Sequence, residues 1–365
     1  MLQAHVLTDQ QELDALAEDW EQLVERSAGA TPFQSHGWLA SWWQSYGRPG
    51  RLRVVTVRRP DGRLVALAPL MRGPGGLRPI GVGLTDFHDV LIDPEHAEQA
   101  APVLARALAR QLRAPWATLD LREVRADASA RLLAAHWPGR AAELPDSLCQ
   151  HLPGLPMDDL LRRLPGRTAQ RTRVKLRKLA AAGVVVRDVP AAEMPQAVDR
   201  LLALHALQWT GRGVTREHLR ERFAAHLRRS AVALAARGRA AMHEYELDGR
   251  LIAVDLELMA RGIAALYFYG VHPSARERLD IAGMLFGENL AHALRSGMVE
   301  INLLRGDEPY KQRWRPERSQ NARLLLGRGP AVRLRVALLR TDRALRDWAK
   351  RRAPWLRKAA RIVSG

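Results

Sequence analysis

Three short apolar segments divided by two tight turns, within residues 241–271, constrain the fold most strongly. The segments read AMHEYEL, LIAVDLELM and IAALYFYGV, and the letters DGR and ARG separate them. Glycine beside a polar residue between two apolar runs is typical of a hairpin, so we expect an antiparallel meander. Segments with helical periodicity lie on both sides of it. The sequence therefore predicts an α/β protein, of the α+β kind, built on a mixed sheet.

A similar order of elements occurs in both halves of the chain. The first half gives helices at 10–27 and within 31–47, strands RLRVVTVRR and RLVALAPLMRG, a helix at 95–112 and a strand at 116–124. The second half gives helices at 193–210 and 215–229, the meander, a helix at 280–296 and the strand VEINLL. Prolines and glycines cluster at 138–156. We therefore predict two domains, 1–150 and 151–330, followed by a tail at 331–365.

Composition indicates an ordinary globular protein. The chain has 365 residues, of which 47% are hydrophobic, and its one cysteine, Cys149, excludes an internal disulfide bond. The first twenty residues lack the basic start and apolar core of a signal peptide, and no stretch approaches the roughly 18 apolar residues of a membrane span. We expect a soluble cytoplasmic protein in which Cys149 is structural.

The net charge of +18 is the main argument for a polyanionic partner. Arginine carries almost all of the excess, because lysine occurs only at positions 175, 178, 311, 350 and 358. Arginine together with abundant alanine, leucine and glycine is typical of a GC-rich genome. We therefore do not infer a nucleic-acid partner from the charge alone.

The tail at 331–365 carries half of the excess charge, with eleven basic residues against two acidic ones. A helix at 331–351 is predicted because four apolar side chains recur on one face, namely Leu334, Leu338, Leu345 and Trp348. Lys350, Arg351 and Arg352 are contiguous and precede Trp355. Such a helix can pack on the body of the protein or dock on a membrane. We predict weak docking on an anionic membrane.

The stretch LLRGDEPYKQRW, residues 303–314, begins at the end of the strand VEINLL. Tyr310, Lys311 and Trp314 recur there at helical spacing after a loop that contains Asp307. One interpretation is a capped helix start, with Asp307 as the cap and proline in the first turn. That interpretation does not require the lysine, which is rare in this chain. We predict that the side chains of this strand end contact substrate.

Two acidic residues and two phenols lie on the last hairpin of the meander. Asp255 and Glu257 share one face of their strand, and Tyr267 and Tyr269 share one face of the next. A three-residue turn at 260–262 places Asp255 opposite Tyr267, whereas a two-residue turn breaks that pairing. If these groups face a cleft, they can take a proton from an attacking amine or hydroxyl. The alternative is a sheet with one solvated face.

These elements and motifs resemble a GNAT acyltransferase over residues 240–314. Over roughly residues 5–325 the chain is similar to the CelD-like branch of that superfamily, which is related to the Fem-type peptidyltransferases. The segments that carry the resemblance are TPFQSHGWLASWWQSYG, RTRVKLRKL, LLALHALQW, LYFYGVHPSARERLDIAGMLF and LLRGDEPYKQRW. The resemblance implies two tandem GNAT-like domains, the second one catalytic, with the basic helical tail outside it.

The resemblance also implies a binding site for coenzyme A. GNAT enzymes bind the pyrophosphate with an arginine and with glycines that open a helix. The residues in those positions here are Arg278, Ile281, Ala282 and Gly283. Ile281 replaces a glycine of that pattern. The plain alternative is a helix start capped by Asp280.

Further roles follow from the resemblance for the stretch at 303–314. Tyr310 stands where GNAT enzymes place a tyrosine that protonates the leaving thiolate. Lys311 and Trp314 stand where Fem-type enzymes place a lysine near the reacting carbonyl and a second aromatic residue. An ammonium group there stabilises the oxyanion. Asp307 would orient Lys311 or accept the proton of the nucleophile.

Other features allow more than one interpretation. The helix at 167–182 carries six basic residues and no acidic one, which suits either a phosphorylated acceptor or a solvated face. His205 and Trp209 lie one helical turn apart, as a buried pair or as part of a substrate site. His36 and His88 lack ligand partners at convincing spacing, so no metal site is predicted.

The predicted function is direct transfer of an acyl group from acetyl-CoA or another acyl-CoA to an amino or hydroxyl group of a sugar or envelope-polysaccharide precursor. Asp255 and Glu257 complete the predicted catalytic set. The predicted substrate contacts are Tyr267, Tyr269, His205, Trp209 and Trp314. One alternative is a Fem-like transferase that uses aminoacyl-tRNA, which suits the basic surface. The other is a non-catalytic scaffold that binds membrane or nucleic acid through a decayed GNAT core. We expect a cytoplasmic protein whose tail contacts the inner membrane face.

Overall fold

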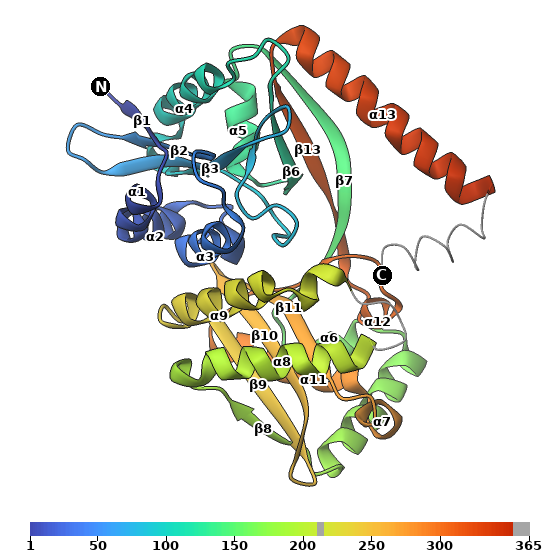
Figure 1. Ribbon diagram of the computed structural model, residues 1–365. Coiled ribbons are helices and arrows are strands. Elements are labelled where there is room, and N and C mark those ends of the chain that lie inside the picture. The colour runs from blue at the N-terminus through green and yellow to red at the C-terminus, as the bar shows by residue number, and fades with distance from the viewer. Residues whose placement is uncertain (210–214, 353–365) are drawn as a thin grey trace. The chain divides into compact units, whose positions relative to one another are not determined.

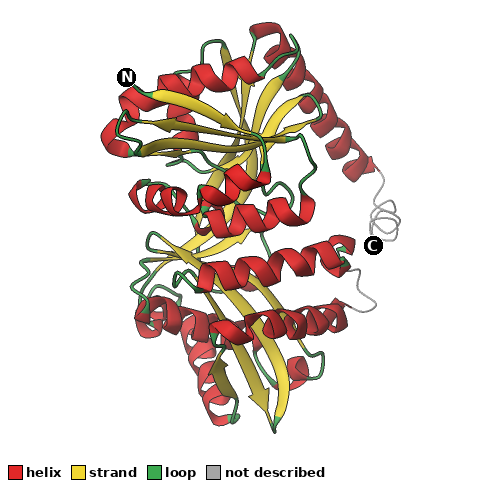
Figure 2. Cartoon of the chain, turned by 60° about the vertical axis from the view of Figure 1, so that its left-hand side comes forward, coloured by secondary structure: helices red, strands yellow, loops and turns green. Residues whose placement is uncertain are grey.

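The computed structural model describes residues 1–209 and 215–352, and Figure 1 labels its elements along the chain. The chain forms two compact units. Unit 1 comprises residues 1–147 together with the described residues from Gln320 onward, and unit 2 comprises residues 148–319. Within each unit helices flank a mixed sheet (Figure 2). This is the mixed α/β architecture that the sequence predicts.

The sheet of unit 1 has the strand order β1-β2-β3-β4-β6-β13, and β5 pairs with β3. Its neighbouring strands are antiparallel except β4 and β6, which are parallel. The strands are β1 (Gln3–Leu7), β2 (Leu52–Arg58), β3 (Leu64–Gly73), β4 (Gly76–Pro79), β5 (Leu91–Ile92), β6 (Thr118–Val124) and β13 (Glu317–Gly327). The helices are α1 (Gln10–Ala15), α2 (Ala17–Arg26), α3 (His36–Tyr46), α4 (Ala97–Gln111) and α5 (Ser129–Ala135).

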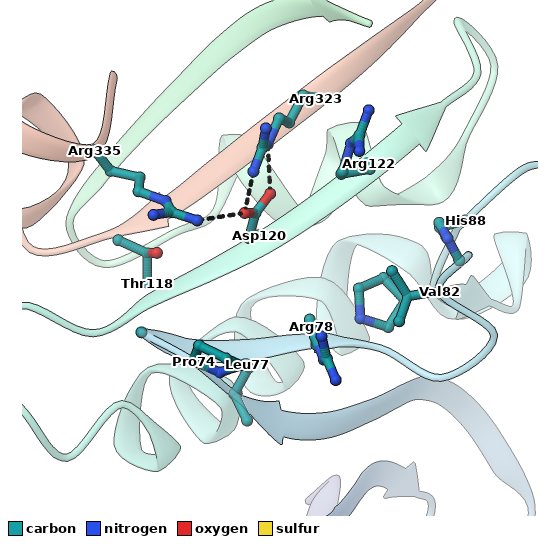
Figure 3. A pocket seen from close by; sticks show the side chains of 12 residues that line it. Pro74, Leu77, Arg78, Val82, His88, Thr118, Asp120, Arg122, Arg323 and Arg335 are labelled. Carbon is teal, nitrogen blue, oxygen red and sulfur yellow. Dashed lines mark hydrogen bonds and ion pairs between the residues drawn. The ribbon is translucent and has the colours of Figure 1, made fainter. Parts of the chain in front are cut away.

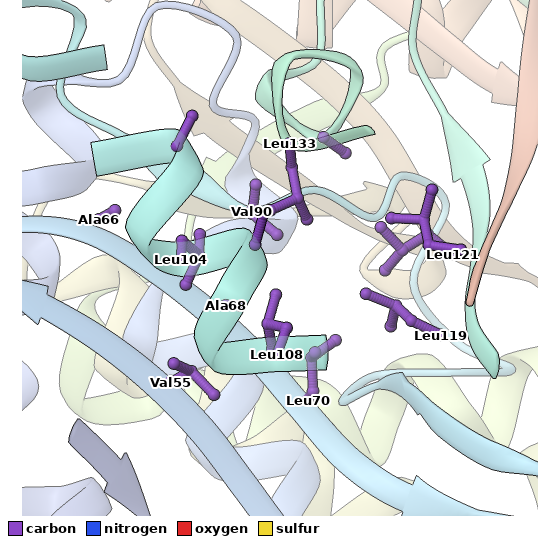
Figure 4. Packing of buried hydrophobic residues seen from close by; sticks show 14 of the residues in the cluster. Val55, Ala66, Ala68, Leu70, Val90, Leu104, Leu108, Leu119, Leu121 and Leu133 are labelled. Atoms are coloured by element: carbon purple, nitrogen blue, oxygen red, sulfur yellow. The ribbon is translucent and has the colours of Figure 1, made fainter. Parts of the chain in front are cut away.

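The main core of unit 1 lies between its sheet and α4 (Figure 4). Leu104 and Leu108 of α4 are one turn apart and fully buried. They belong to one cluster with Val55 of β2, Leu70 of β3 and Leu119 of β6. Burial of one leucine side chain contributes about 1.5–3 kcal/mol relative to exposure. The apolar stripe of α4 therefore explains why this helix lies against the strands.

The sheet of unit 2 has the strand order β7-β12-β11-β10-β9-β8. The strands are β7 (Arg140–Pro153), β8 (Val185–Asp188), β9 (Ala240–Leu247), β10 (Arg250–Ala260), β11 (Ile263–Val271) and β12 (Glu300–Arg305). The helices are α6 (Met157–Arg162), α7 (Gly166–Ala181), α8 (Met194–Trp209), α9 (Glu221–Ala235), α10 (Ala275–Arg278), α11 (Ile281–Arg295) and α12 (Pro309–Gln312). The predicted meander is β9, β10 and β11.

The two sheets have the same pairing pattern. Counted from β1 or from β8, the first four strands are antiparallel neighbours, the fourth and fifth are parallel, and the fifth and sixth are antiparallel. The sixth strand of unit 1, β13, comes last of all strands in the sequence, and that of unit 2, β7, comes before every other strand of its sheet. Residues 320–330 therefore belong to unit 1, whereas the predicted boundary places them in the second domain. The predicted break at 138–156 contains the fourteen-residue strand β7.

The hairpin of β10 and β11 has a two-residue turn made of Arg261 and Gly262. Their φ angles are 51° and 79°, as a type I′ turn requires. A β-bulge at Tyr267 shifts the register between this turn and Asp255, so Asp255 pairs with Tyr269. The pairing of Asp255 with Tyr267, which a three-residue turn would give, is wrong.

Helix α13 (Gly329–Arg352) begins with two buried residues, Ala331 and Val332. Four of the apolar side chains that follow are each more than half exposed, namely Leu334, Leu338, Leu345 and Trp348. Trp355 lies outside the described residues, and so do the side chains of Lys350, Arg351 and Arg352. Within 1–209 and 215–352, no helix is both long and apolar enough to cross a membrane.

Candidate active site

The parallel strands β11 and β12 of unit 2 pair only where they begin. Residues 263–265 lie beside residues 300–302, and the pairing then ends although β11 continues to Val271. On its other side β11 pairs with β10 along its whole length. The second half of β11 thus has one edge that no described strand occupies. The end of β12, where the sequence predicts catalytic residues, lies beyond the point at which the two strands stop pairing.

Side chains of α8 bond two backbone groups in this half of β11. Nδ1 of His205 lies 3.1 Å from the carbonyl oxygen of Tyr269, and the N–H of Val271 donates to Oε1 of Gln208 at 3.1 Å. Gly270 permits the close approach, because a Cβ there would lie 2.2 Å from a carbonyl oxygen of α8. Unpaired strand edges can bind extended ligands through their backbone. Here α8 already satisfies two such groups.

Lys311 lies at the turn that ends β12. This turn has positive φ angles at Leu304 and Gly306, 61° and 106°. The Lys311 side chain is only 4% exposed, and its Nζ donates to the carbonyl oxygen of Arg305 at 2.8 Å and pairs with Oε2 of Glu308 at 2.7 Å. Within the described residues these two contacts use two of its three N–H donors. The ammonium group therefore both holds the turn and has a donor for a further acceptor.

Asp307 does not orient Lys311, contrary to one of its two predicted roles. It accepts hydrogen bonds from the side-chain amides of Gln150 at 3.0 Å and Gln312 at 2.6 Å. It is also not the cap of the following helix, because Glu308 occupies that position and no side chain caps it. The carboxylate that sequence reasoning missed is Glu308. Its spacing of three residues from Lys311 is the signal that would have found it.

Two phenols lie close to this ion pair. Burial raises the pKa of Tyr310, and the Tyr269 phenol and the Glu308 carboxylate raise it further. Burial also raises the pKa of Tyr269. Both hydroxyls are protonated at neutral pH and can donate a proton to a leaving group. Tyr310 is 41% exposed, so a ligand can reach it. Tyr267 lies beside Phe268, with 6.1 Å between ring centroids.

The carboxylates of Asp255 and Glu257 do not face a cleft. Asp255 accepts hydrogen bonds from the Tyr245 hydroxyl at 2.8 Å and from Asn289 of α11 at 2.5 Å. Glu257 is fully buried and lies 2.7 Å from Nδ1 of His292, also on α11. The face of the sheet that carries them is covered by α11. Neither the predicted catalytic cleft nor the alternative of a solvated face is therefore correct for this pair.

The N-terminus of α11 is already beside an anionic side chain. The Asp280 carboxylate binds the Arg313 guanidinium at 2.6 and 3.0 Å and lies 3.9 Å from Nζ of Lys175. A Cβ on Gly283 would lie 2.8 Å from the same carboxylate. A helix N-terminus favours negative charge, and Asp280 supplies it. In this arrangement the Asp280 carboxylate lies beside the terminus at which the coenzyme A pyrophosphate was predicted to bind.

The remaining predicted pyrophosphate residues do not form one group. Arg278 pairs with Asp248 at 2.9 Å, whereas Ile281, Ala282 and Gly283 form the first turn of α11. The basic helix α7 lies beside α11. Among the ion pairs of the described residues, Lys175 has the contact with Asp280 and the other five cations of α7 have none. Five cations of α7 therefore have no acidic partner among the described residues.

The remaining predicted substrate residues lie in two places. Trp314 is buried and stacks on Phe286, with 4.2 Å between ring centroids, so it is part of the core. His205 is buried and lies 6.2 Å from the Trp209 ring, which is 36% exposed. Trp209 therefore can meet a ligand, whereas Trp314 packs inside unit 2.

Unit 1 has a cavity of about 230 Å³ beside its own parallel strand pair, β4 and β6 (Figure 3). Arginines dominate its lining, and two of them, Arg323 and Arg335, converge on Asp120. Arg323 makes a bidentate contact with that carboxylate at 2.7 and 2.5 Å, and Arg335 lies 3.6 Å from it. The sequence gives no sign of this cavity, because its residues come from segments about two hundred positions apart.

Comparison with known sequences identifies one domain. Residues 166–312 match the family described as acetyltransferase (GNAT) domain. The matched segment includes β11, β12, Tyr310 and Lys311, and it covers less than half of the chain. A search of the curated proteins found no match.

Solved structures show a similar fold for most of the chain. FemX has a TM-score of 0.60 at 13% identity, covering 91% of this chain and 99% of its own. A domain described as the C-terminal domain of a lysylphosphatidylglycerol synthetase from Agrobacterium fabrum has a TM-score of 0.58 at 14% identity, covering 91% and 96%. L-PGS from Bacillus licheniformis has a TM-score of 0.55 at 11% identity, covering 88% and 93%. The chain thus has a GNAT-type fold, and the CelD-like branch stays a prediction.

Proposed function

We propose that unit 2 is an acyltransferase that joins an acyl group to an amine or hydroxyl at the end of β12. One observation carries the proposal: Tyr310 and the Lys311–Glu308 ion pair lie together at the start of α12, in a segment that matches an acetyltransferase domain. Acyl transfer needs a donor of protons to the leaving group and a positive group for the oxyanion. This group of side chains contains both.

In the proposed reaction the nucleophile attacks the carbonyl carbon of the donor, and the carbonyl oxygen becomes an oxyanion. The tetrahedral intermediate then collapses and the bond to the leaving atom breaks. We assign the oxyanion to Lys311, protonation of the leaving group to Tyr310, and acceptance of the nucleophile's proton to the exposed carboxylate of Asp307. Asp255 and Glu257 take no part in this scheme, because α11 covers them.

The donor that we propose first is acetyl-CoA or another acyl-CoA, because the matched family is described as an acetyltransferase domain. No step is assigned to its pyrophosphate, since Asp280 holds the terminus of α11. The second candidate donor is an aminoacyl-tRNA. The unpaired cations of α7 favour it, because a nucleic-acid backbone binds through such charges.

The acceptor that we propose is an amino or hydroxyl group of a sugar or envelope-polysaccharide precursor. Support comes from the sequence resemblance to the CelD-like branch, which implies an acceptor of this class. The resemblance concerns the class of acceptor and not its identity.

The proposal is tested by incubating tag-free protein with acceptor mixtures. Each mixture also contains either labelled acetyl-CoA or labelled aminoacyl-tRNA as the donor. Tyr310→Phe should lose transfer, whereas Tyr46→Phe in unit 1 should retain it. A donor at about 100 times its Kd should also raise the free energy of unfolding by about 2.7 kcal/mol. Transfer from aminoacyl-tRNA alone selects the second donor. No transfer and no stabilisation with either donor would leave the non-catalytic scaffold.

A further inference from the structure

Asp188, His243 and Glu288 come together in unit 2 from three different elements. Asp188 ends β8 and is the register partner of His243 on β9, and Glu288 lies on α11. One possible ligand atom from each lies within 4.8 Å of the other two. The separation of these residues along the chain explains why sequence spacing predicts no metal site here.

His243 has a ring nitrogen that no hydrogen bond satisfies. The side chain is fully buried, and its Nδ1 lies 2.9 Å from Oδ1 of Asp255. Asp255 is a carboxylate that accepts from Tyr245 and Asn289 as well, so it takes the Nδ1 proton, and in the neutral imidazole Nε2 then carries a lone pair. Nε2 has no hydrogen-bond partner and points toward Asp188, 3.6 Å from Oδ1. A carboxylate that holds the other ring nitrogen is the usual support of a metal-bound histidine.

We infer that Asp188, His243 and Glu288 bind one divalent transition-metal ion of the zinc class. Two ligand atoms on a tetrahedral Zn²⁺ at about 2.1 Å lie roughly 3.4 Å apart, close to the observed separation of Nε2 and Oδ1. The imidazole ligand favours zinc over magnesium or calcium, which prefer oxygen ligands. Asp188 is 72% exposed, so the ion can enter from solvent and water can complete its coordination.

The ion would stabilise β8, a strand with few other contacts. All four residues of β8 are exposed, and the strand pairs only with β9 among the described elements. A metal bridge from Asp188 to Glu288 would join this strand to α11. The rival explanation for the position of Nε2 is that it carries a proton and donates it to Asp188. The 3.6 Å between Nε2 and Oδ1 of Asp188 is too long for such a hydrogen bond. The inference is independent of the acyl-transfer proposal, because none of the three residues belongs to that site.

Calorimetric titration of the tag-free, chelator-treated full chain with ZnCl₂ tests the site, with MgCl₂ as the contrast. One zinc ion per chain should bind, and magnesium at the same concentration should not. Asp188→Asn and Glu288→Gln should each weaken zinc binding at least tenfold. Glu246→Gln, which changes an exposed carboxylate on the same strand as His243, should leave it unchanged.

A second measurement separates the site from adventitious binding. Zinc should raise the Tm of the parent chain and of Glu246→Gln, but not that of Asp188→Asn or Glu288→Gln. Far-UV circular dichroism checks that each variant is folded before titration. Absence of zinc binding by the parent chain would overturn the inference and leave the proton as the explanation. Equal zinc binding by parent and both ligand variants would overturn it too, because the ion would then lie elsewhere.

Discussion

Lys311 combines a structural and a chemical role that substitutions can separate. Its Nζ bonds the carbonyl of Arg305, between two positive-φ residues, and pairs with Glu308. The sequence predicts the lysine because the residue type is rare and the motif is specific. It does not predict which carboxylate reaches the ammonium. That choice depends on the course of the turn, where Leu304 and Gly306 have positive φ angles.

We predict that Lys311→Ala lowers turnover by roughly a hundredfold, because one oxyanion-stabilising group is typically worth that much. The loss of two buried contacts should also lower the free energy of unfolding by about 1–3 kcal/mol. Glu308→Gln is the matched control, since it keeps the ammonium and removes only a half-exposed ion pair. Steady-state kinetics and denaturant unfolding measure the two effects. Unchanged turnover in a folded Lys311→Ala protein would remove the lysine from the mechanism.

A second residue-scale prediction concerns His205 and His218, whose ring nitrogens lie 3.3 Å apart. Burial lowers the pKa of His218 to about 4, and the neighbouring His205 lowers it as well. The unfolded value is about 6.5, so between about pH 6.5 and 4 the unfolded state binds more protons. The contribution to stability is therefore complete above about pH 6.5 and is lost as the pH falls toward 4.

Thermal unfolding at pH 7.5 and pH 5.0 measures this loss. The decrease in Tm between the two pH values should be smaller in His218→Gln than in the parent chain. His5→Gln, at an exposed position of unit 1, should behave as the parent does. An equal decrease in His218→Gln and parent would show that this pair does not set the acid sensitivity of unit 2.

At the scale of elements, most of the long periodic helices agree with the sequence prediction to within a few residues. The helix predicted at 215–229 is instead observed as Glu221–Ala235, and the one predicted at 10–27 is divided into α1 and α2. Helix 167–182 is observed as Gly166–Ala181, and 280–296 as Ile281–Arg295. Strand β7 was missed because Pro145 and Pro153 interrupt its pattern and resemble a linker. The bulge at Tyr267 of β11 was missed because the alternation of residues along one strand does not show where its pairing register shifts.

The contact between α8 and β11 gives an element-scale prediction. Gly270→Ala should lower the free energy of unfolding by about 1–3 kcal/mol, because its Cβ would lie 2.2 Å from a carbonyl oxygen of α8. Gly287→Ala is the matched control within α11, where a Cβ meets nothing within 4 Å. It should be neutral or stabilising by up to about 1 kcal/mol. Denaturant unfolding distinguishes the two, and equal effects would mean that α8 can shift to accept the methyl group.

At the scale of the whole molecule, the repeated order of elements predicted two units of one kind, and the two sheets have matching pairing patterns. The sequence could not show that the sixth strand of unit 1, β13, follows every strand of unit 2 in the chain. Strand pairing is a non-local interaction, and neither β7 nor β13 carries a signal for its partner. This is also why the cavity in unit 1, which needs Arg323 beside Asp120, follows only from the folded chain.

We propose that α13 determines where in the cell the whole molecule resides. Its exposed apolar side chains share one face, and the helix also carries many arginines. Ala331 and Val332 are buried and Arg335 lies 3.6 Å from Asp120, so the start of the helix is fixed to unit 1. The part that follows is left to meet an anionic bilayer, where each basic residue near the surface contributes about 1 kcal/mol at low salt.

Substitution tests this better than truncation, which would expose the buried start of the helix. The double variant Leu338→Gln, Leu345→Gln removes apolar area and keeps every charge. It should bind vesicles with anionic headgroups several-fold more weakly than the parent in co-sedimentation at low salt. High salt should release the parent from these vesicles, and neutral vesicles should bind neither protein. Apolar insertion and charge act together at an interface. Equal partition of both proteins onto anionic vesicles would therefore mean that the exposed face of α13 does not enter a membrane. Membrane recruitment through α13 should then be abandoned.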